Sequence, residues 1–206
     1  HAYLGTDADP KTIRRALSVA GLSKRKTASV IDRVASVLES GKVVARCAGA
    51  MEWGPRALGN RSILAAPFDP EINQWLNDRL GRSEFMPFAP ATLAEDAALM
   101  YVDLDGGINA ARYMTMTFDC TERMRREAPA AVHVDGTARP QLVFEDQYPE
   151  FHRILSEYKR LTGLSSMINT SFNIKAHKLN MWSFHPFFIS FTKLSLLLSF
   201  MYLFDS

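Results

Sequence analysis

The stretch that most constrains the fold is residues 149–173, in which a helix pattern runs directly into a strand pattern. The helical part reads PEFHRILSEYKRLTG, with Pro149 suited to the first helical position and Gly163 to the C-terminal cap. The residues SSMINTSFN that follow predict a strand and a loop. A helix joined closely to a strand is a unit of folds that mix the two elements.

The rest of the chain alternates similar patterns without internal repeats. Helices are expected from Asp9-Pro10 to about Gly21, over residues 27–40 before Gly41, and over about 70–81. Strands are expected in KVVARCAG, SILAAP, ARYMTMTFDC and PAAVHVDG, the last ending in a turn. This interleaving predicts a fold of the α/β (α+β) class.

Composition limits the classes of partner. The chain has 24 Lys and Arg against 22 Asp and Glu, a net charge of +2, so no bulk field favours nucleic acid and any anion site must be local. Its two cysteines, Cys47 and Cys120, match neither a metal-ligand spacing nor a disulfide framework. The N-terminal residues lack the apolar run of a signal peptide, so we expect a cytoplasmic protein. The first residue is His1, which suggests a piece of a longer chain.

Residues 176–206 differ in character from residues 1–175, and we treat the two as separate regions. Phe, Leu and Ser dominate the tail, and no acidic residue occurs between Glu157 and Asp205. A membrane anchor is one reading, although Lys193 interrupts the apolar run and Pro186 precedes it, which disfavours a membrane span. A buried terminal segment and a sequence from a wrong reading frame or retained intron are the other two.

Four polar stretches interrupt the hydrophobic pattern, at residues 54–62, 81–90, 133–139 and 169–173. Each falls at a predicted strand end or turn, where such folds usually build sites. They combine arginines, whose planar fork of donors fits phosphate or carboxylate oxygens, with small hydroxyl and amide side chains. The pattern predicts a pocket for an anion, most plausibly phosphate. The candidate residues are Arg56, Asn60, Arg61, Ser62, Arg82, His133, Thr137, Arg139, Asn169, Thr170, Ser171 and Asn173.

Each stretch also has a purely structural interpretation. Arg56 and Arg61 could be surface residues paired with Glu52 or Asp69. His133 could be a hydrogen-bonded structural residue, and the Asp-Gly pair after it a simple turn. The NTSFN residues could form a loop whose side chains bond their own backbone.

Four motifs together carry a family resemblance. In order, MEWGPRALGNRSILA, FMPFAP, HVDGTARPQ and INTSFN resemble the C-terminal domain of the NodU/CmcH-type O-carbamoyltransferases, over roughly residues 2–175. The resemblance implies a YrdC-like fold, with a twisted mixed sheet and flanking helices. It implies an enzyme that uses ATP and carbamoyl phosphate to form carbamoyl adenylate and pyrophosphate. It also implies a partner, an N-terminal domain resembling the actin-like ATPase fold, which transfers the carbamoyl group to an acceptor hydroxyl.

The resemblance also implies roles for residues. Arg139, Ser171 and Asn173 would be catalytic: Arg139 would bind carbamoyl phosphate or the triphosphate, and the other two match the Ser-x-Asn element of YrdC-like sites. Arg56 and Arg61 would hold phosphate groups, and the remaining candidates would contact substrate or nucleotide. Magnesium would accompany ATP, but the sequence offers no carboxylate cluster as its cage, and we assign no metal ligand.

Two departures from the family pattern affect the prediction. Leu80 and Met86 stand where the family carries a Lys and an Arg, and Arg79 and Arg82 are the nearby substitutes for that charge. The Gly-Glu-Pro-Ile-like stretch, the last helix and the closing strand that follow NTSFN in the family are missing. Two alternatives therefore stay open: a non-catalytic remnant that binds phosphate or nucleotide, and a threonylcarbamoyl-adenylate synthase-like domain, which the lack of a basic surface disfavours.

Overall fold

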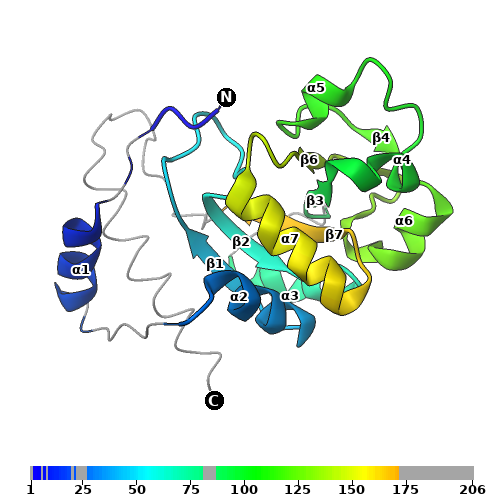
Figure 1. Ribbon diagram of the computed structural model, residues 1–206. Helices are drawn as coiled ribbons and strands as arrows, with labels where there is room; N and C mark the ends of the chain where they lie inside the picture. The colour runs from blue at the N-terminus through cyan, green and yellow to red at the C-terminus, as the bar shows by residue number, and fades with distance from the viewer. Residues whose placement is uncertain are drawn as a thin grey trace.

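The computed structural model describes residues 2–5, 7, 9–19, 21, 27–80 and 87–171. At its centre lies a mixed sheet with the strand order β1-β2-β7-β3-β6 (Figure 1). Neighbours are antiparallel except for β3 and β6, which run parallel. The strands are β1 (Val44–Cys47), β2 (Arg61–Ala65), β3 (Pro90–Leu93), β6 (Gln141–Val143) and β7 (Ser166–Ser171). This sheet and its flanking helices confirm the predicted α/β class.

Helices cover both faces of the sheet. On one face α2 (Val30–Glu39) and α7 (Pro149–Thr162) pack side by side (Figure 1). Their buried apolar side chains form one core with Leu64 of β2 and Met167 of β7. On the other face α3 (Glu71–Arg79) packs through Leu76 against Ile63 and Ile168. Because successive residues of a strand point to opposite faces, neighbouring positions in β2 and β7 serve different cores.

A smaller unit continues beyond the β3–β6 side of the sheet (Figure 1). Its own apolar core includes Met100, Phe118 and Met124. The unit is built from short elements: η1 (Ala94–Asp96), α4 (Ala97–Met100), α5 (Ile108–Ala111), β4 (Phe118–Asp119), α6 (Glu122–Glu127), η2 (Pro129–Ala131) and β5 (Thr137–Ala138).

The longer elements follow the sequence prediction closely. The α7 helix ends at Gly163, whose φ of 78° is the left-handed value expected of a C-terminal cap. The α1 helix (Pro10–Val19) is capped by Asp9, whose side chain accepts hydrogen bonds from the N–H groups of Lys11 and Thr12. The predictions for α2, α3, β1, β2 and β7 are likewise confirmed.

Two strand predictions are wrong. In residues 111–120 only Phe118–Asp119 is a strand, because α5 extends to Ala111 and Met114 takes a left-handed φ of 55°. In residues 129–136 the chain forms η2 and then a turn. The small side chains of Ala130 and Ala131 are buried in two different cores there, which lets η2 pack closely against α3 and α6.

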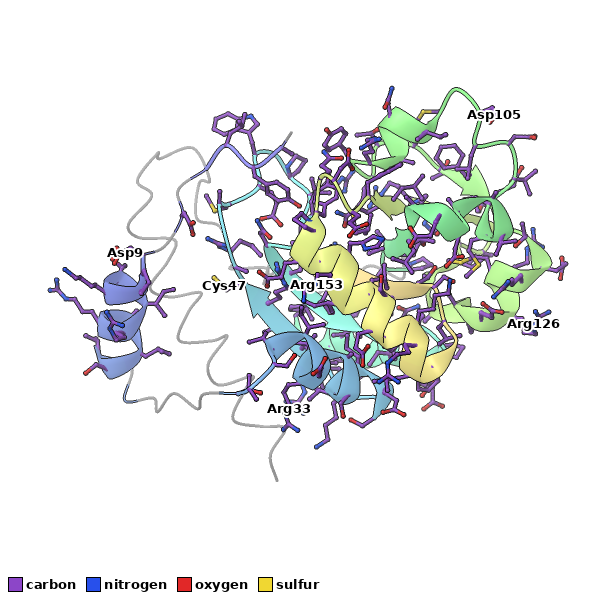
Figure 2. All side chains as sticks on the ribbon, in the orientation of Figure 1. Asp9, Arg33, Cys47, Asp105, Arg126 and Arg153 are labelled. Atoms are coloured by element: carbon purple, nitrogen blue, oxygen red, sulfur yellow. The ribbon has the colours of Figure 1, made fainter. Side chains whose placement is uncertain are left out.

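Charged side chains are spread around the outside of the molecule. Figure 2 shows Arg33, Arg126 and Arg153 on the outer surfaces of three different helices, and all three are exposed. No helix among the described residues is both long enough and apolar enough to cross a membrane. The tail of residues 176–206, with its three readings, lies outside the described residues.

Candidate anion site at one end of the sheet

The strand directions bring the polar stretches to one end of the sheet. Residues Cys47 and Arg61 pair across β1 and β2, and Ser62 pairs with Ser171 across β2 and β7. Therefore β1 and β7 finish at the end where β2, β3 and β6 begin. The loop before β2, the segment before β6 and the last residues of β7 meet there. Of the other candidates, Arg82 and Asn173 lie outside the described residues.

Three of the predicted residues hold the loop before β2 rather than projecting from it. The Arg61 guanidinium donates to the carbonyl oxygens of Ala48, Gly49 and Asn60, at 2.7, 3.1 and 2.9 Å. The Asn60 side chain donates to Ala50 O at 2.8 Å, and the buried Ser62 hydroxyl accepts from Gly59 N. The interpretation of Arg61 as the ion-pair partner of Glu52 or Asp69 is wrong.

Two buried charged residues that the sequence analysis did not select also hold this loop. Arg46, 7% exposed, donates to Gly59 O at 2.6 Å and to Asn60 Oδ1 at 2.9 Å, and pairs with Glu150 at 2.8 Å. Glu52, 8% exposed, accepts from the backbone N–H groups of the loop. A single Arg inside the apolar run VVARCAG is a usable signal, because buried charges are rare unless paired.

The HVDGT stretch forms a tight turn, as its structural interpretation predicted. Gly136 has a φ of 83° and donates to His133 O, and Asp135 Oδ1 accepts from the N–H and hydroxyl of Thr137. The His133 ring lies 2.9 Å from Thr137 Oγ1. Burial lowers the pKa of His133, the Arg139 charge lowers it further, and Asp135 opposes both. His133 is thus held mainly neutral as a hydrogen-bonded side chain of the turn.

Arg56 and Arg139 come together although they belong to different stretches. Burial lowers the pKa of Arg139, and the nearby charge of Arg56 lowers it further. The Arg139 Nε is buried and has no hydrogen-bond partner within the described residues. Arg56 is exposed and makes no hydrogen bond or ion pair with any residue that the structure describes. Two like charges near enough to affect one another, with a buried donor left unpaired, are suited to bind an anion.

Near the end of β7, the Asn169 side chain supports neighbouring segments and is not exposed at the surface. Asn169, 1% exposed, donates from Nδ2 to Gln141 Oε1 at 2.7 Å and to Ala57 O at 3.1 Å. Its side chain therefore bonds other segments, which rules out the self-bonded loop interpretation for Asn169. Thr170 is buried, and Ser171 is half-buried at the end of the strand.

Residue 80, where the family pattern has a charged side chain, is part of the core in this chain. Leu80 is 1% exposed and packs with Leu76 and Phe88. Arg79, one of the two suggested substitutes, lies over the Trp75 ring at 5.2 Å from its centroid. A charged side chain would not fit in the place of Leu80 without desolvation. Met86 lies outside the described residues.

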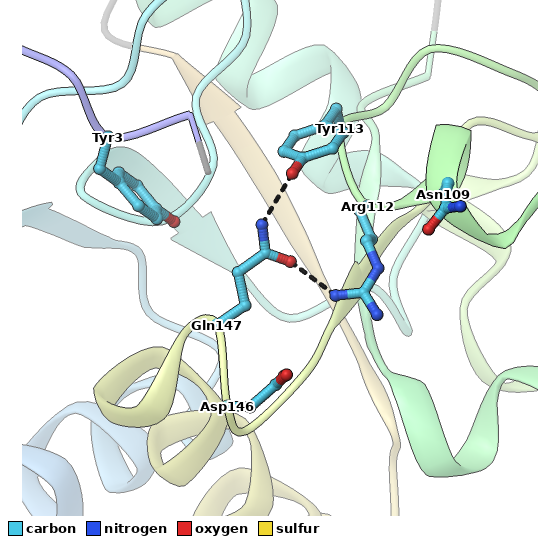
Figure 3. Close-up of a pocket in the computed structure, with 6 residues that line it drawn as sticks. All are labelled: Tyr3, Asn109, Arg112, Tyr113, Asp146 and Gln147. Atoms are coloured by element: carbon cyan, nitrogen blue, oxygen red, sulfur yellow. Dashed lines mark hydrogen bonds between the residues drawn. The ribbon is translucent and has the colours of Figure 1, made fainter.

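A cavity of about 590 Å³ is lined by none of the predicted residues. Figure 3 shows Gln147 between Arg112 and Tyr113, accepting from the former at 2.8 Å and donating to the latter at 2.9 Å. The Arg112 guanidinium also lies 3.6 Å from the centroid of the Phe144 ring. Tyr3 of the cavity wall donates to Leu58 O, so the cavity adjoins the loop before β2.

No group of three or more His, Cys, Asp or Glu suited to a metal ion occurs among the described residues. The arrangement can therefore bind an anion through Arg56 and Arg139, and magnesium binding stays a prediction.

Comparison with known proteins gives a consistent set of relatives. The family model of the carbamoyltransferase C-terminus matches residues 35–181. The chain is 39% identical over 141 residues to the uncharacterized protein MJ1058 of Methanocaldococcus jannaschii, covering 68% of this chain and 22% of that protein. It is 38% identical over 143 residues to nodulation protein U of Sinorhizobium fredii, covering 69% and 25%. It is 35% identical over 156 residues to nodulation protein NolO of Bradyrhizobium diazoefficiens, covering 75% and 28%. The chain thus spans about a quarter of the length of these relatives.

Proposed function

The chain belongs to the carbamoyltransferase family, and from this membership we propose that it activates carbamoyl phosphate with ATP for transfer to an acceptor hydroxyl. The structural observation that supports the proposal is the buried, unpartnered Nε of Arg139, with Arg56 near enough for its charge to lower the pKa of Arg139. Both substrates are polyanions, so bringing them together requires fixed positive charge and oriented donors. Ser171 and, beyond the described residues, Asn173 would contact phosphate oxygens from the end of β7.

The proposed activation of carbamoyl phosphate takes two steps. Water displaces phosphate from carbamoyl phosphate, giving carbamate and inorganic phosphate. A carbamate oxygen then attacks the α-phosphorus of ATP, forming carbamoyl adenylate as the bond to pyrophosphate breaks. In the later transfer the acceptor hydroxyl oxygen attacks the carbamoyl carbon, AMP leaves with the electron pair, and the hydroxyl proton passes to a base. Magnesium would travel with the ATP phosphates.

The acceptor hydroxyl would be selected outside this chain. On the family resemblance, we assign acceptor binding and the transfer step to a separate N-terminal domain. We propose a cytoplasmic location, where ATP and carbamoyl phosphate are available.

The test is release of phosphate and pyrophosphate by the purified chain, with ATP and with or without carbamoyl phosphate. We expect one phosphate and one pyrophosphate per carbamoyl adenylate, only when both substrates are present. Arg139→Ala should lower the rate by about 100-fold, as expected when a donor to developing charge is removed. The control is Arg153→Ala, an exposed arginine on the outer surface of α7. Full activity in Arg139→Ala would refute the role of Arg139.

The second candidate is a non-catalytic domain that binds a phosphorylated ligand. The observation favouring it is the burial of Leu80, at a position where the family carries a Lys. ATP binding without release of pyrophosphate in the same assay would identify this alternative.

A further inference from the structure

The loop that carries Arg56 is neither helix nor strand, yet the backbone of its last residues, 58–60, is fully hydrogen-bonded. Every backbone N–H and C=O group of Leu58, Gly59 and Asn60 has a partner. These partners include side chains from β1, β2, β6 and the N-terminal segment. Irregular backbone usually relies on water for such bonds, so a loop satisfied by surrounding side chains is held in one conformation.

Three N–H groups at this end of the loop are held by one carboxylate. Glu52 Oε1 accepts from Leu58 N at 2.9 Å, Asn60 N at 2.7 Å and Arg61 N at 3.1 Å. Bonds from N–H groups to a carboxylate are about twice as strong as those between neutral groups. Because Glu52 is almost completely buried, these bonds replace the water that the carboxylate has lost.

The Leu58 carbonyl group is held by two further side chains. Gln141 Nε2 donates to Leu58 O at 2.9 Å, and the Tyr3 hydroxyl donates to the same oxygen at 2.7 Å. The Gln141 side chain is itself fixed, because its Oε1 accepts from Asn169. Glu52 thus binds three N–H groups here, and Gln141 and Tyr3 bind the carbonyl oxygen of Leu58.

We propose that Glu52, with Gln141 and Tyr3, positions the loop so that the Arg56 guanidinium stays beside Arg139 to bind an anion. The three are positioning residues, because none of them is placed to touch the anion itself. The inference rests on the anion site of the proposed function and adds the residues that preorganise it. Preorganisation raises affinity because less conformational freedom is lost when the ligand binds.

Charge alone makes the opposite prediction for Glu52. The carboxylate is a negative charge at the base of a cationic loop, so neutralising it would by Coulomb's law strengthen the binding of an anion. If Glu52 instead positions the loop, neutralising it weakens anion binding despite the favourable change of charge. The sign of the effect therefore separates the two roles.

The experiment measures binding of inorganic pyrophosphate to the chain by calorimetry. Glu52→Gln should weaken binding about tenfold through lost preorganisation. Glu71→Gln, an exposed carboxylate of α3, is the matched control and should leave binding unchanged. In the Arg56→Ala background, Glu52→Gln should have no further effect, because residues that act through one another are not additive. Tyr3→Phe removes one donor without altering packing, and should weaken binding in the same direction by a smaller factor.

Amide hydrogen exchange provides the second readout and does not depend on catalysis. Glu52→Gln should speed exchange at Leu58, Asn60 and Arg61 by about tenfold while the amides of β7 stay unchanged. Unchanged exchange at these amides, tighter pyrophosphate binding, an additive effect in the Arg56→Ala background, or no binding by the parent chain would each overturn the proposal. Pyrophosphate binding with the expected variant effects, but no carbamoyl-phosphate-dependent release, would instead refute the proposed activity and leave the positioning role standing.

Discussion

Gly59 shows how tightly single residues are specified beside the candidate site. Its φ is 113°, a value that side-chain-bearing residues rarely adopt, and a Cβ added there would lie 2.7 Å from the Phe151 ring. The carbonyl of Gly59 also accepts from Arg46, whose guanidinium lies over the same ring. The glycine therefore lets the loop approach α7 closely enough for Arg46 to reach both.

Gly59→Ala is expected to destabilise the chain more than Gly54→Ala. Both glycines have φ values near 110°, so both substitutions strain the backbone, at about 1–3 kcal/mol each. Only Gly59 meets a ring, which adds an overpacking cost of about 1–3 kcal/mol. Urea denaturation of the two variants measures the difference. Equal free energies of unfolding would show that the contact with Phe151 is relieved by repacking.

At the scale of elements, α7 is fixed to the molecule by both apolar and charged contacts. Ile154, Leu155 and Tyr158 are buried in the core that α7 shares with α2 and the sheet. Lys159 near its C-terminal end pairs with Asp96 of η1 at 2.5 Å. The ion pair links α7 to the start of the smaller unit, which otherwise has its own core.

The Asp96–Lys159 pair should make stability depend on pH at acidic values. Burial raises the pKa of Asp96, but the hydrogen bond and charge of Lys159 outweigh it, so the pKa lies below its usual value. The carboxylate therefore stabilises the fold at neutral pH, and this contribution is lost as the pH falls through the folded-state pKa. Asp96→Asn should lower the free energy of unfolding by about 1 kcal/mol at pH 7. The gap should close at acidic pH, once the pH has fallen through the folded-state pKa of Asp96.

The matched control is Asp105→Asn, an exposed aspartate labelled in Figure 2. It should leave the free energy of unfolding unchanged at both pH values. A gap between the parent chain and Asp96→Asn that persists at low pH would mean that packing, rather than charge, is lost on substitution.

At the scale of the whole molecule, β7 is the strand on which the sheet is assembled. It pairs with β2 on one side and β3 on the other, and its alternate residues enter the cores of both faces. It is also late in the sequence, so the sheet is completed by contacts between distant parts of the chain. Separating β7 from its neighbours would open both cores at once.

The slowest amide hydrogen exchange is therefore expected in β7. Opening a central strand requires global unfolding, whereas β1 pairs only with β2 among the described strands and can open locally. Exchange in β1 should be at least about tenfold faster than in β7. Mass spectrometry of peptides covering the two strands measures the ratio. Equal protection would indicate that the sheet opens as one unit.

Much of this fold could be predicted because the long elements carry clear local signals. The α7 helix has a proline at its start and a capping glycine, and both serve as expected. Residues 111–120 misled the prediction because α5 and the left-handed Met114 interrupt the run of β-forming residues, and Thr115 and Thr117 are exposed, which leaves only β4. Short strands such as β3 and β6 gave no local signal, since tertiary pairing defines them.

The gathering of the polar stretches at one end of the sheet could be predicted, but the contacts of their residues could not. The strand directions bring these stretches to one end, as expected from their positions at strand ends. Arg61 and Asn169 were assigned to the ligand, yet their donors bind the backbone of the loop before β2. Glu52 could not be selected, because three N–H groups converge on it only after the loop has folded.

The strand directions also have a practical consequence for handling the protein. The turn at Ser40 and Gly41 enters β1 at the end of the sheet opposite to Arg56 and Arg139, and both of its residues are exposed. A fluorophore attached there would lie far from the candidate anion site. A linker attached there would leave that site facing away from the support. Ligand binding could then be followed on an immobilised chain without the attachment chemistry touching Arg56 or Arg139.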